Sequence, residues 1–173
     1  MLVIEEFQKK DAKDKRRYIL DLVLNHCSDQ HIWFQEALKS RDNPYHDYFI
    51  WRDGDETEPP NIMRATFGGS AWTYVPELGQ YYFHQFAVEQ PDLNWDNPKM
   101  RYELYDSIRF WVDKGVEGFR LDVIDQIGKD ADLQISNNGP KLHDYLRELS
   151  ANMVLRGLQA RFRHPDLTIC AGW

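Results

Sequence analysis

The sequence predicts an α/β fold, because strand-like and helix-like segments alternate along it. A near-continuous apolar run of strand length, YILDLVLNH, occupies residues 18–26. The clearest helical pattern follows at 98–114, and another strand-like run, VEGFRLDV, begins directly after it at residue 116. Two strands joined through a helix form a β-α-β unit, in which the strands are parallel and the crossover is right-handed.

The segments around this unit continue the alternation. Residues 4–17 predict a charged helix with a weak apolar side, and LTIC at 167–170 predicts a last short strand. A second amphipathic helix is expected at about 141–158, with Pro140 at its start. Its inward side is expected to carry Leu142, Tyr145, Leu146, Leu149 and Met153. The resulting order β-α-β-α-β is typical of α/β proteins.

The helix at 98–114 has clear signals at both ends. Asn97 can cap its first turn, and Pro98 takes the first helical position, where a missing N–H costs nothing. Gly115 is expected to end it. The spacing predicts one apolar face made of Met100, Leu104, Ile108 and Trp111.

Residues 27–95 have a different character and predict a loop-rich insertion. A short helix is expected within 28–40, with Ser28 or Asp29 as its N-cap. Turn signals follow in DGDETEPPN and FGGS, and QYYFHQF at 80–86 could form a strand of a small antiparallel sheet. We therefore divide the chain into a main part, 1–26 with 96–173, and an inserted small domain, 27–95.

Composition excludes several classes of protein. The net charge of −7 and the isoelectric point near 5.3 argue against nucleic acid or an anionic membrane as the main partner. No run approaches the roughly 20 apolar residues of a membrane span, and the first residues contain no signal-peptide core, so a cytoplasmic location is expected. Two cysteines make neither a disulfide framework nor a metal knuckle.

Aromatic residues are concentrated in one part of the chain. They make up 14% of the sequence, and residues 31–95 hold 14 of the 24. Rings at this density suit a surface that stacks on sugars or bases. They equally suit a small loop-rich domain that uses large side chains for its core.

Chemistry is most plausible where the strands end. In the strand that begins at residue 116, Gly118, Arg120 and Asp122 share one face, with Asp122 at the carboxyl end, where α/β proteins build their sites. Arg120 lies about 6–7 Å along that face and should favour the ionised carboxylate, which suits a nucleophile. A purely structural Arg–Asp pair is the alternative. Asn25 and His26 also stand at a carboxyl end.

Three ordered motifs carry a family resemblance: DLVLNH at 21–26, QPDLNW at 90–95 and GFRLDV at 118–123. With connecting stretches such as FGGSAWTY and NNGPKLHDYLREL, they resemble the alpha-amylase family of glycoside hydrolases over about residues 18–158. The nearest group is that of the bacterial oligo-1,6-glucosidases and glucan 1,6-alpha-glucosidases. The resemblance implies part of a TIM (β/α)8 barrel, about strands 3 to 5, with a loop-rich small domain inserted after strand 3.

The resemblance also implies roles for matching residues. Asp122 would be the nucleophile of a retaining alpha-glucosidase that releases terminal alpha-1,6-linked glucose from an isomaltose-like oligosaccharide, with alpha-1,4-linked glucose as the alternative. Arg120 would hold Asp122, and Val123 would favour alpha-1,6 bonds. Asn25 would contact the insertion. The remaining sugar-binding residues would be His26, Phe67, Phe86 and Gln90. No cofactor and no metal ion are expected.

The chain departs from the family at the second carboxyl group. Where the family has its acid/base glutamate the chain reads TICAGW, with Ala171 at the expected position. Family strands before DLVLNH, with a loop that commonly holds calcium, and the later barrel strands have no match here. We therefore expect residues 1–173 alone to hydrolyse little or nothing.

Three alternatives remain open from the sequence. The chain could be a non-catalytic sugar-binding protein or a remnant. It could be a trehalose-6-phosphate hydrolase, although these usually carry asparagine where Asp125 stands. It could also resemble the sucrose isomerases, which usually have different residues after the nucleophile.

Overall fold

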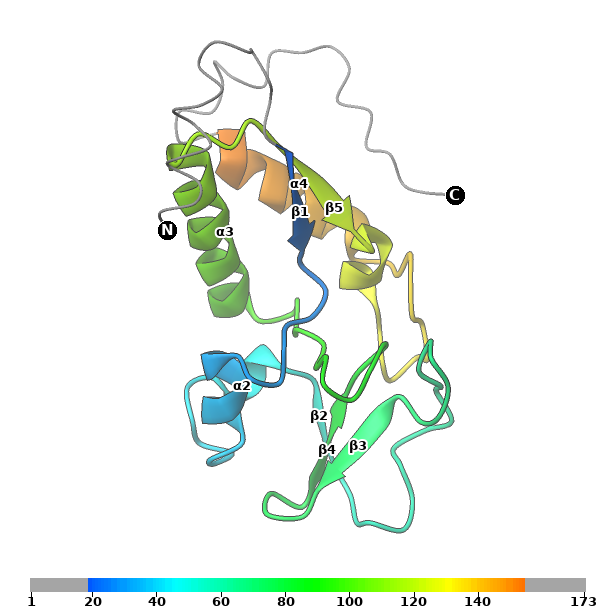
Figure 1. The fold of residues 1–173 in the computed structure, drawn as a ribbon. Helices are drawn as coiled ribbons and strands as arrows, with labels where there is room; N and C mark the ends of the chain where they lie inside the picture. The colour runs from blue at the N-terminus through cyan, green and yellow to red at the C-terminus, as the bar shows by residue number, and fades with distance from the viewer. Residues whose placement is uncertain (1–18, 155–173) are drawn as a thin grey trace.

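The structure is a computed structural model that describes residues 19–154 (Figure 1). The expected helix at 4–17, the expected strand at 167–170 and Ala171 lie outside the described residues. The helices and strands, in chain order, are β1 (Ile19–Val23), α2 (Ile32–Ala37), the 3-10 turn η1 (His46–Tyr48), β2 (Trp51–Asp53), β3 (Trp72–Val75), β4 (Gln80–Phe83), α3 (Pro98–Asp113), β5 (Gly118–Asp122), the 3-10 turn η2 (Ile124–Gly128) and α4 (Leu142–Val154).

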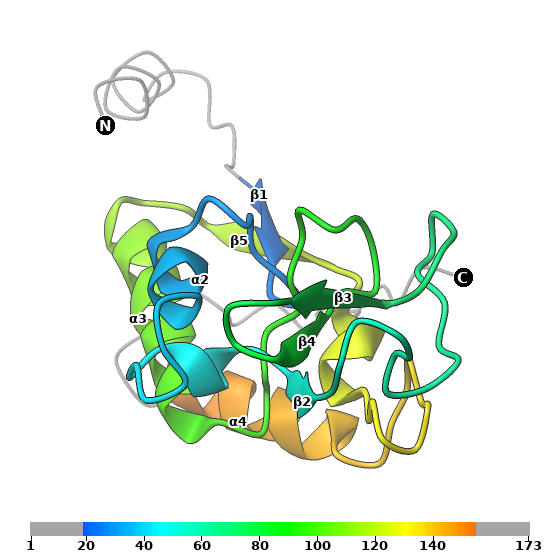
Figure 2. The same ribbon diagram turned by 90° about the horizontal axis from the view of Figure 1, so that it is seen from below.

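The described part of the chain contains two separate sheets. β1 and β5 pair in parallel, with Asp21 opposite Arg120 and Val23 opposite Asp122. α3 lies between them in the sequence, so the predicted β-α-β unit is confirmed. The second sheet is antiparallel with strand order β2-β4-β3. The small sheet lies beyond the carboxyl ends of β1 and β5. Figure 2 shows the molecule from below, which is the end at which the small sheet lies.

Two predicted boundaries within 27–95 are wrong. α2 begins at Ile32 and is capped by His31, whose Nδ1 accepts from the backbone N–H of Trp33 (3.2 Å). Ser28 belongs to a turn that precedes the helix, because its carbonyl accepts a hydrogen bond from the backbone N–H of His31 (2.9 Å). β4 ends at Phe83, since the chain then turns and the His84 ring bonds the carbonyl of Phe86 (3.2 Å).

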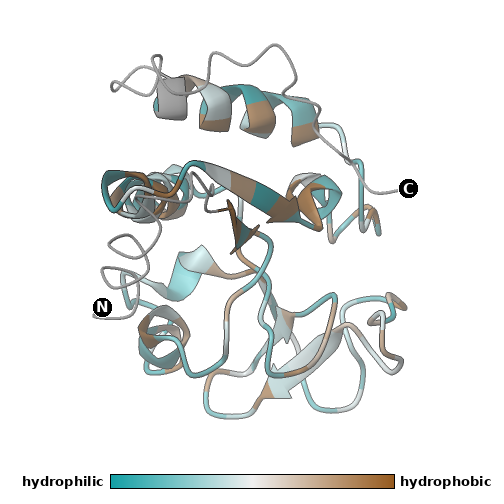
Figure 3. Ribbon diagram, turned by 45° about the horizontal axis from the view of Figure 1, so that its top comes forward, coloured by the Kyte–Doolittle hydropathy of each residue, from teal (hydrophilic) through white to brown (hydrophobic). Residues whose placement is uncertain are grey.

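The helices bury the expected type of face. α3 buries Met100 and Ile108 as predicted, together with Tyr105 and Val112. The expected Leu104 is partly buried against the same core, and Trp111 is half-buried. α3 is joined to α4 by the Arg101–Glu148 ion pair (2.9 Å). α4 buries Leu142, Tyr145 and Leu149, with Leu146 partly buried. Figure 3 shows the more hydrophobic side of α4 turned toward the parallel strands.

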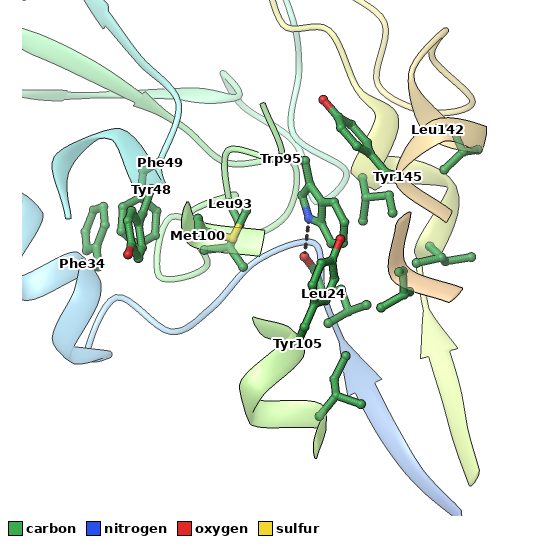
Figure 4. Close-up of a cluster of buried hydrophobic side chains, with 14 of the residues drawn as sticks. Leu24, Phe34, Tyr48, Phe49, Leu93, Trp95, Met100, Tyr105, Leu142 and Tyr145 are labelled. Atoms are coloured by element: carbon green, nitrogen blue, oxygen red, sulfur yellow. Dashed lines mark hydrogen bonds between the residues drawn. The ribbon is translucent and has the colours of Figure 1, made fainter. Parts of the chain in front are cut away.

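One hydrophobic core joins the insertion to the main part of the chain (Figure 4). The indole N–H of Trp95 donates to the carbonyl of Leu24 (2.8 Å), and the Trp95 and Tyr145 rings are 5.5 Å apart. Most rings of the aromatic-rich stretch are buried, and the buried ones are Phe34, Tyr48, Phe49, Trp51, Trp72, Tyr81, Tyr82, Phe83 and Trp95. Their density is therefore explained mainly by core packing. Phe67, at 74% exposure, is the clear exception.

Replacing Asn97 with alanine is expected to destabilise the protein by about 1 kcal/mol. The Asn97 side-chain oxygen accepts from the backbone N–H groups of Lys99 (2.9 Å) and Met100 (3.3 Å), which alanine cannot do. The measurement is the midpoint of thermal unfolding. Asn97→Asp, which keeps the acceptor oxygen, should lose less, and equal losses in the two variants would contradict a capping role.

No helix within residues 19–154 combines the length and the apolar character that crossing a membrane requires.

Candidate functional site

The candidate site begins with a charged trio on the exposed face of the parallel sheet. The Arg120 guanidinium lies between two carboxylates, 3.1 Å from Asp21 Oδ2 through Nη1 and 3.0 Å from Asp122 Oδ1 through Nη2. Its interaction with Asp21, and then with Asp122, raises the pKa of Arg120. The prediction that Arg120 and Asp122 lie side by side on one sheet face is confirmed. The pairing of Arg120 with Asp21 was not predicted. Strand register explains it, because Asp21 stands directly opposite Arg120.

Val123 adopts a backbone conformation that β-branched residues rarely adopt. Its φ and ψ are 42° and 40°, in the left-handed region. The chain needs this bend because β5 ends at Asp122 and the 3-10 turn η2 starts at Ile124. Such a conformation costs about 1–3 kcal/mol and is typical of functional sites. Residue spacing alone does not predict this conformation.

His26 stands at the same end of the sheet and is linked to three other predicted sugar-binding residues. Its Nε2 lies 3.1 Å from Nε2 of Gln90, and its ring centroid lies 5.0 Å from that of Phe86. The Phe86 ring is in turn 5.9 Å from the exposed ring of Phe67. We call His26, Phe67, Phe86 and Gln90 the aromatic wall. It combines apolar ring surface with polar nitrogen groups.

The structure thus gathers the predicted residues into two groups, the aromatic wall and the charged trio with Val123. Among the described residues, the two groups share no hydrogen bond and no ion pair. They are close enough for the charge of Asp122 to act on the His26 ring.

A buried ion pair is connected to the aromatic wall through the side chain of Asn25. The carboxylate of Asp92 is fully buried and lies 3.1 Å from the ammonium of Lys129, whose side chain is 2% exposed. Asp92 also accepts from the Asn25 side-chain amide (3.1 Å) and from the backbone N–H of Gln85 (3.0 Å). The expected contact of Asn25 with the insertion is confirmed.

Sequence reasoning missed the pairing of Asp92 with Lys129. The aspartate lies inside the QPDLNW motif and could have been singled out as a charge in an apolar setting. Lys129 stands in the polar stretch GKDAD, which gives no sign of burial.

Burial governs the charges around this site. It lowers the pKa of Lys129, against the attraction of Asp92. Burial also lowers the pKa of His26, with Asp92 and Asp122 acting in the opposite direction and Lys129 in the same one. Burial raises the pKa of the Cys27 thiol to about 12, so this thiol is protonated at neutral pH and is no nucleophile.

Acidification below pH 6.5 is expected to destabilise the protein in part through His84. Burial lowers the pKa of this ring from 6.5, against the opposing effects of its bond to the Phe86 carbonyl and of nearby carboxylates. The His84 ring therefore binds a proton more readily in the unfolded chain than in the folded protein. The stability that is present above pH 6.5 is lost as the pH falls toward the pKa of the folded state. The free energy of unfolding falls by up to about 1.4 kcal/mol per pH unit in this range.

The measurement is the free energy of unfolding between pH 5 and pH 8, with His84→Gln compared with His143→Gln. His143 is exposed on α4 and serves as the control. The pH slope should flatten in the His84 variant alone, and an unchanged slope there would contradict this assignment.

The described residues also line an open, polar pocket of about 540 Å³, and none of the predicted site residues lines it. It lies between the small sheet, η2 and the start of α4. Its charged side chains are largely paired with one another, through Arg52 with Asp132 (2.6 Å) and Lys141 with Asp96 (2.5 Å). The predicted site residues therefore lie outside this pocket, on the exposed sheet face and in the aromatic wall.

Within residues 19–154, no three side chains of histidine, cysteine, aspartate or glutamate are placed to hold a metal ion together.

The chain is similar to known carbohydrate-active proteins along most of its length. The family model described as "Alpha amylase, catalytic domain" matches residues 3–161. The glucan 1,6-alpha-glucosidase of Streptococcus pneumoniae serotype 4 is 48% identical over 172 residues, which are 99% of this chain. The oligo-1,6-glucosidase of Parageobacillus thermoglucosidasius is 44% identical over 167 residues, covering 88% of this chain. The chain spans only 29% of the length of each of these relatives.

A solved structure shows the same arrangement. The crystal structure of Bacillus licheniformis trehalose-6-phosphate hydrolase superimposes with a TM-score of 0.84 at 38% sequence identity. The match covers 90% of this chain and 30% of that one.

Proposed function

The chain belongs to the alpha-amylase family of glycoside hydrolases, and from this premise we propose that it contributes to a cytoplasmic retaining alpha-glucosidase that releases terminal alpha-1,6-linked glucose from oligosaccharides. Its parallel strands with α3 and α4 are a portion of the family's (β/α)8 barrel, and the described residues form no closed barrel. Residues 27–95 are proposed as the inserted small domain, which supplies Phe67, Phe86 and Gln90.

The observation that carries this proposal is the position of Asp122. It ends β5, its side chain is one third exposed, and Arg120 contacts it from the same sheet face. A carboxylate at a strand end, partly exposed and in contact with a guanidinium, can approach and attack the anomeric carbon of a sugar.

The aromatic wall gives the sugar a place to bind. Ring faces of Phe67 and Phe86 can cover the apolar side of a pyranose, while the amide of Gln90 and the imidazole of His26 can bond its hydroxyl groups. An uncharged oligosaccharide fits this combination of apolar rings and neutral polar groups.

The proposed reaction has two displacements. Asp122 attacks the anomeric carbon while the glycosidic bond breaks, a glucosyl ester of Asp122 forms, and the leaving oxygen departs as an alcohol with a proton from an acid/base group. Water then attacks the ester and gives a proton back to that group, which releases glucose and restores the carboxylate. A retaining enzyme places its acid/base carboxyl about 5–5.5 Å from the nucleophile. Among residues 19–154 we assign no side chain to that role.

The test measures hydrolysis by the complete gene product, and not by residues 1–173 in isolation. Isomaltose, maltose, sucrose and trehalose-6-phosphate are compared as substrates at equal concentration. We expect the highest kcat/KM for isomaltose and alpha-glucose as the first product seen by NMR. Preference for trehalose-6-phosphate would transfer the assignment to that class of hydrolase, and beta-glucose as first product would contradict retention.

A further inference from the structure

Both ring nitrogens of His26 face the amide groups of other side chains. Nε2 lies 3.1 Å from Nε2 of Gln90, and Nδ1 lies 3.3 Å from Nδ2 of Asn25. The orientation of each amide follows from its other partner. The oxygen of Gln90 accepts from the backbone N–H of Ala87 (3.2 Å), and the nitrogen of Asn25 donates to the carboxylate of Asp92 (3.1 Å). The NH2 group of each amide is therefore directed to the ring.

An NH2 group can only donate, so the ring nitrogen that it meets must accept. A neutral imidazole has one accepting nitrogen, and an imidazolium has none. The contact with Gln90 is the shorter of the two, which assigns the lone pair to Nε2 and the proton to Nδ1. The proton on Nδ1 then leaves the longer contact, with the Asn25 amide nitrogen, as an approach of two donors, and protonation of Nε2 as well would leave neither NH2 group with an acceptor on the ring.

We propose that Gln90 is a positioning residue that holds the imidazole of His26 in its neutral form, with Nε2 as a hydrogen-bond acceptor. The role in sugar binding rests on the proposed function, whereas the protonation state of the ring does not.

The surrounding charges do not all act in the same direction. Asp92 and Asp122 favour a protonated ring, and Lys129 opposes it. Burial of the ring opposes protonation more strongly than any of these charges, and the two NH2 groups add to it. The balance favours the neutral ring.

A neutral His26 matters for the nucleophile. An imidazolium near Asp122 would compete with Arg120 for the attacking carboxylate and would place a cation where an uncharged sugar ring is to bind. By holding the ring neutral, Gln90 keeps Arg120 as the cation in contact with Asp122.

The substitution Gln90→Glu tests this directly. Glutamate has nearly the same shape and can still accept from the Ala87 N–H, but it presents an acceptor to Nε2 in place of a donor. We expect NMR of 15N-labelled histidine, recorded on the protein as expressed from its own gene, to show an unprotonated Nε2 and a protonated Nδ1 for native His26 at pH 6.5. In the Gln90→Glu variant His26 should carry two protons at that pH.

Gln35→Glu is the matched control, because Gln35 is exposed on α2 and bonds the carbonyl of Asp29. It adds the same charge and should leave the His26 signals unchanged. In the Gln90 variant, kcat/KM for an uncharged glucoside should fall by about 10- to 100-fold, and more at lower pH.

A doubly protonated native ring, or one that carries its proton on Nε2, would overturn the proposal. So would a neutral ring in the Gln90→Glu variant. The native spectrum decides the protonation state even if the variant does not fold. Because no substrate is present, this result is independent of the hydrolysis assays, so the proposed function and the role of Gln90 can fail separately.

Discussion

Replacing Asp122 with asparagine is expected to lower hydrolysis of an aryl alpha-glucoside by about 10⁴-fold or more in the protein as expressed from its own gene. Asparagine keeps the shape of the side chain but removes the negative charge, so no glucosyl ester can form. The measurement is kcat together with intact-mass analysis of enzyme denatured during turnover. The native protein should carry one glucosyl unit and the variant none.

Asp113→Asn is the control for this substitution. Asp113 is exposed at the end of α3, away from the carboxyl ends of the strands, and its replacement should leave kcat unchanged. An Asp122→Asn variant that retains native turnover would rule out Asp122 as the nucleophile. Loss of activity without any glucosyl adduct on the native protein would instead exclude the covalent mechanism.

Replacing Lys129 with methionine is expected to destabilise the contact between the insertion and the main part of the chain by about 3–5 kcal/mol. The variant leaves the carboxylate of Asp92 buried without its cation, although Asn25 and Gln85 still donate to it. Hydrogen exchange reports this locally, because the amide of Leu93 in the insertion donates across that contact to the carbonyl of Asn25 (2.9 Å). Exchange there should accelerate by at least about 100-fold.

A second lysine provides the comparison. Lys39 pairs with Glu36 on the surface, where its side chain is 64% exposed, so Lys39→Met should cost less than about 1 kcal/mol. Adding Asp92→Asn to Lys129→Met should recover part of the stability, because the unpaired charge is then gone. Equal effects of the two lysine substitutions would contradict a structural role for the buried pair.

Much of the fold could be predicted because its signals are local. Asn97 and Pro98 mark the start of α3 through groups that act within one helical turn, and the alternating residues of β5 place Arg120 and Asp122 on one face whatever lies around the strand. The predicted boundaries of α2 and β4 were wrong because they depend on turns. In these turns Ser28 and His84 form hydrogen bonds that residue propensities do not predict.

The sequence by itself determined the α/β class, the β-α-β unit, the family and the position of Asp122 at a strand end, since each depends on spacing along the chain. Only the tertiary structure decided what surrounds that residue. Strand register places Asp21 beside Arg120. Lys129 pairs with Asp92, which is 37 positions earlier in the sequence. A backbone N–H of the insertion orients the Gln90 amide toward His26. These contacts join segments distant in sequence, and their energies depend on burial and orientation, which exist only once the chain is folded.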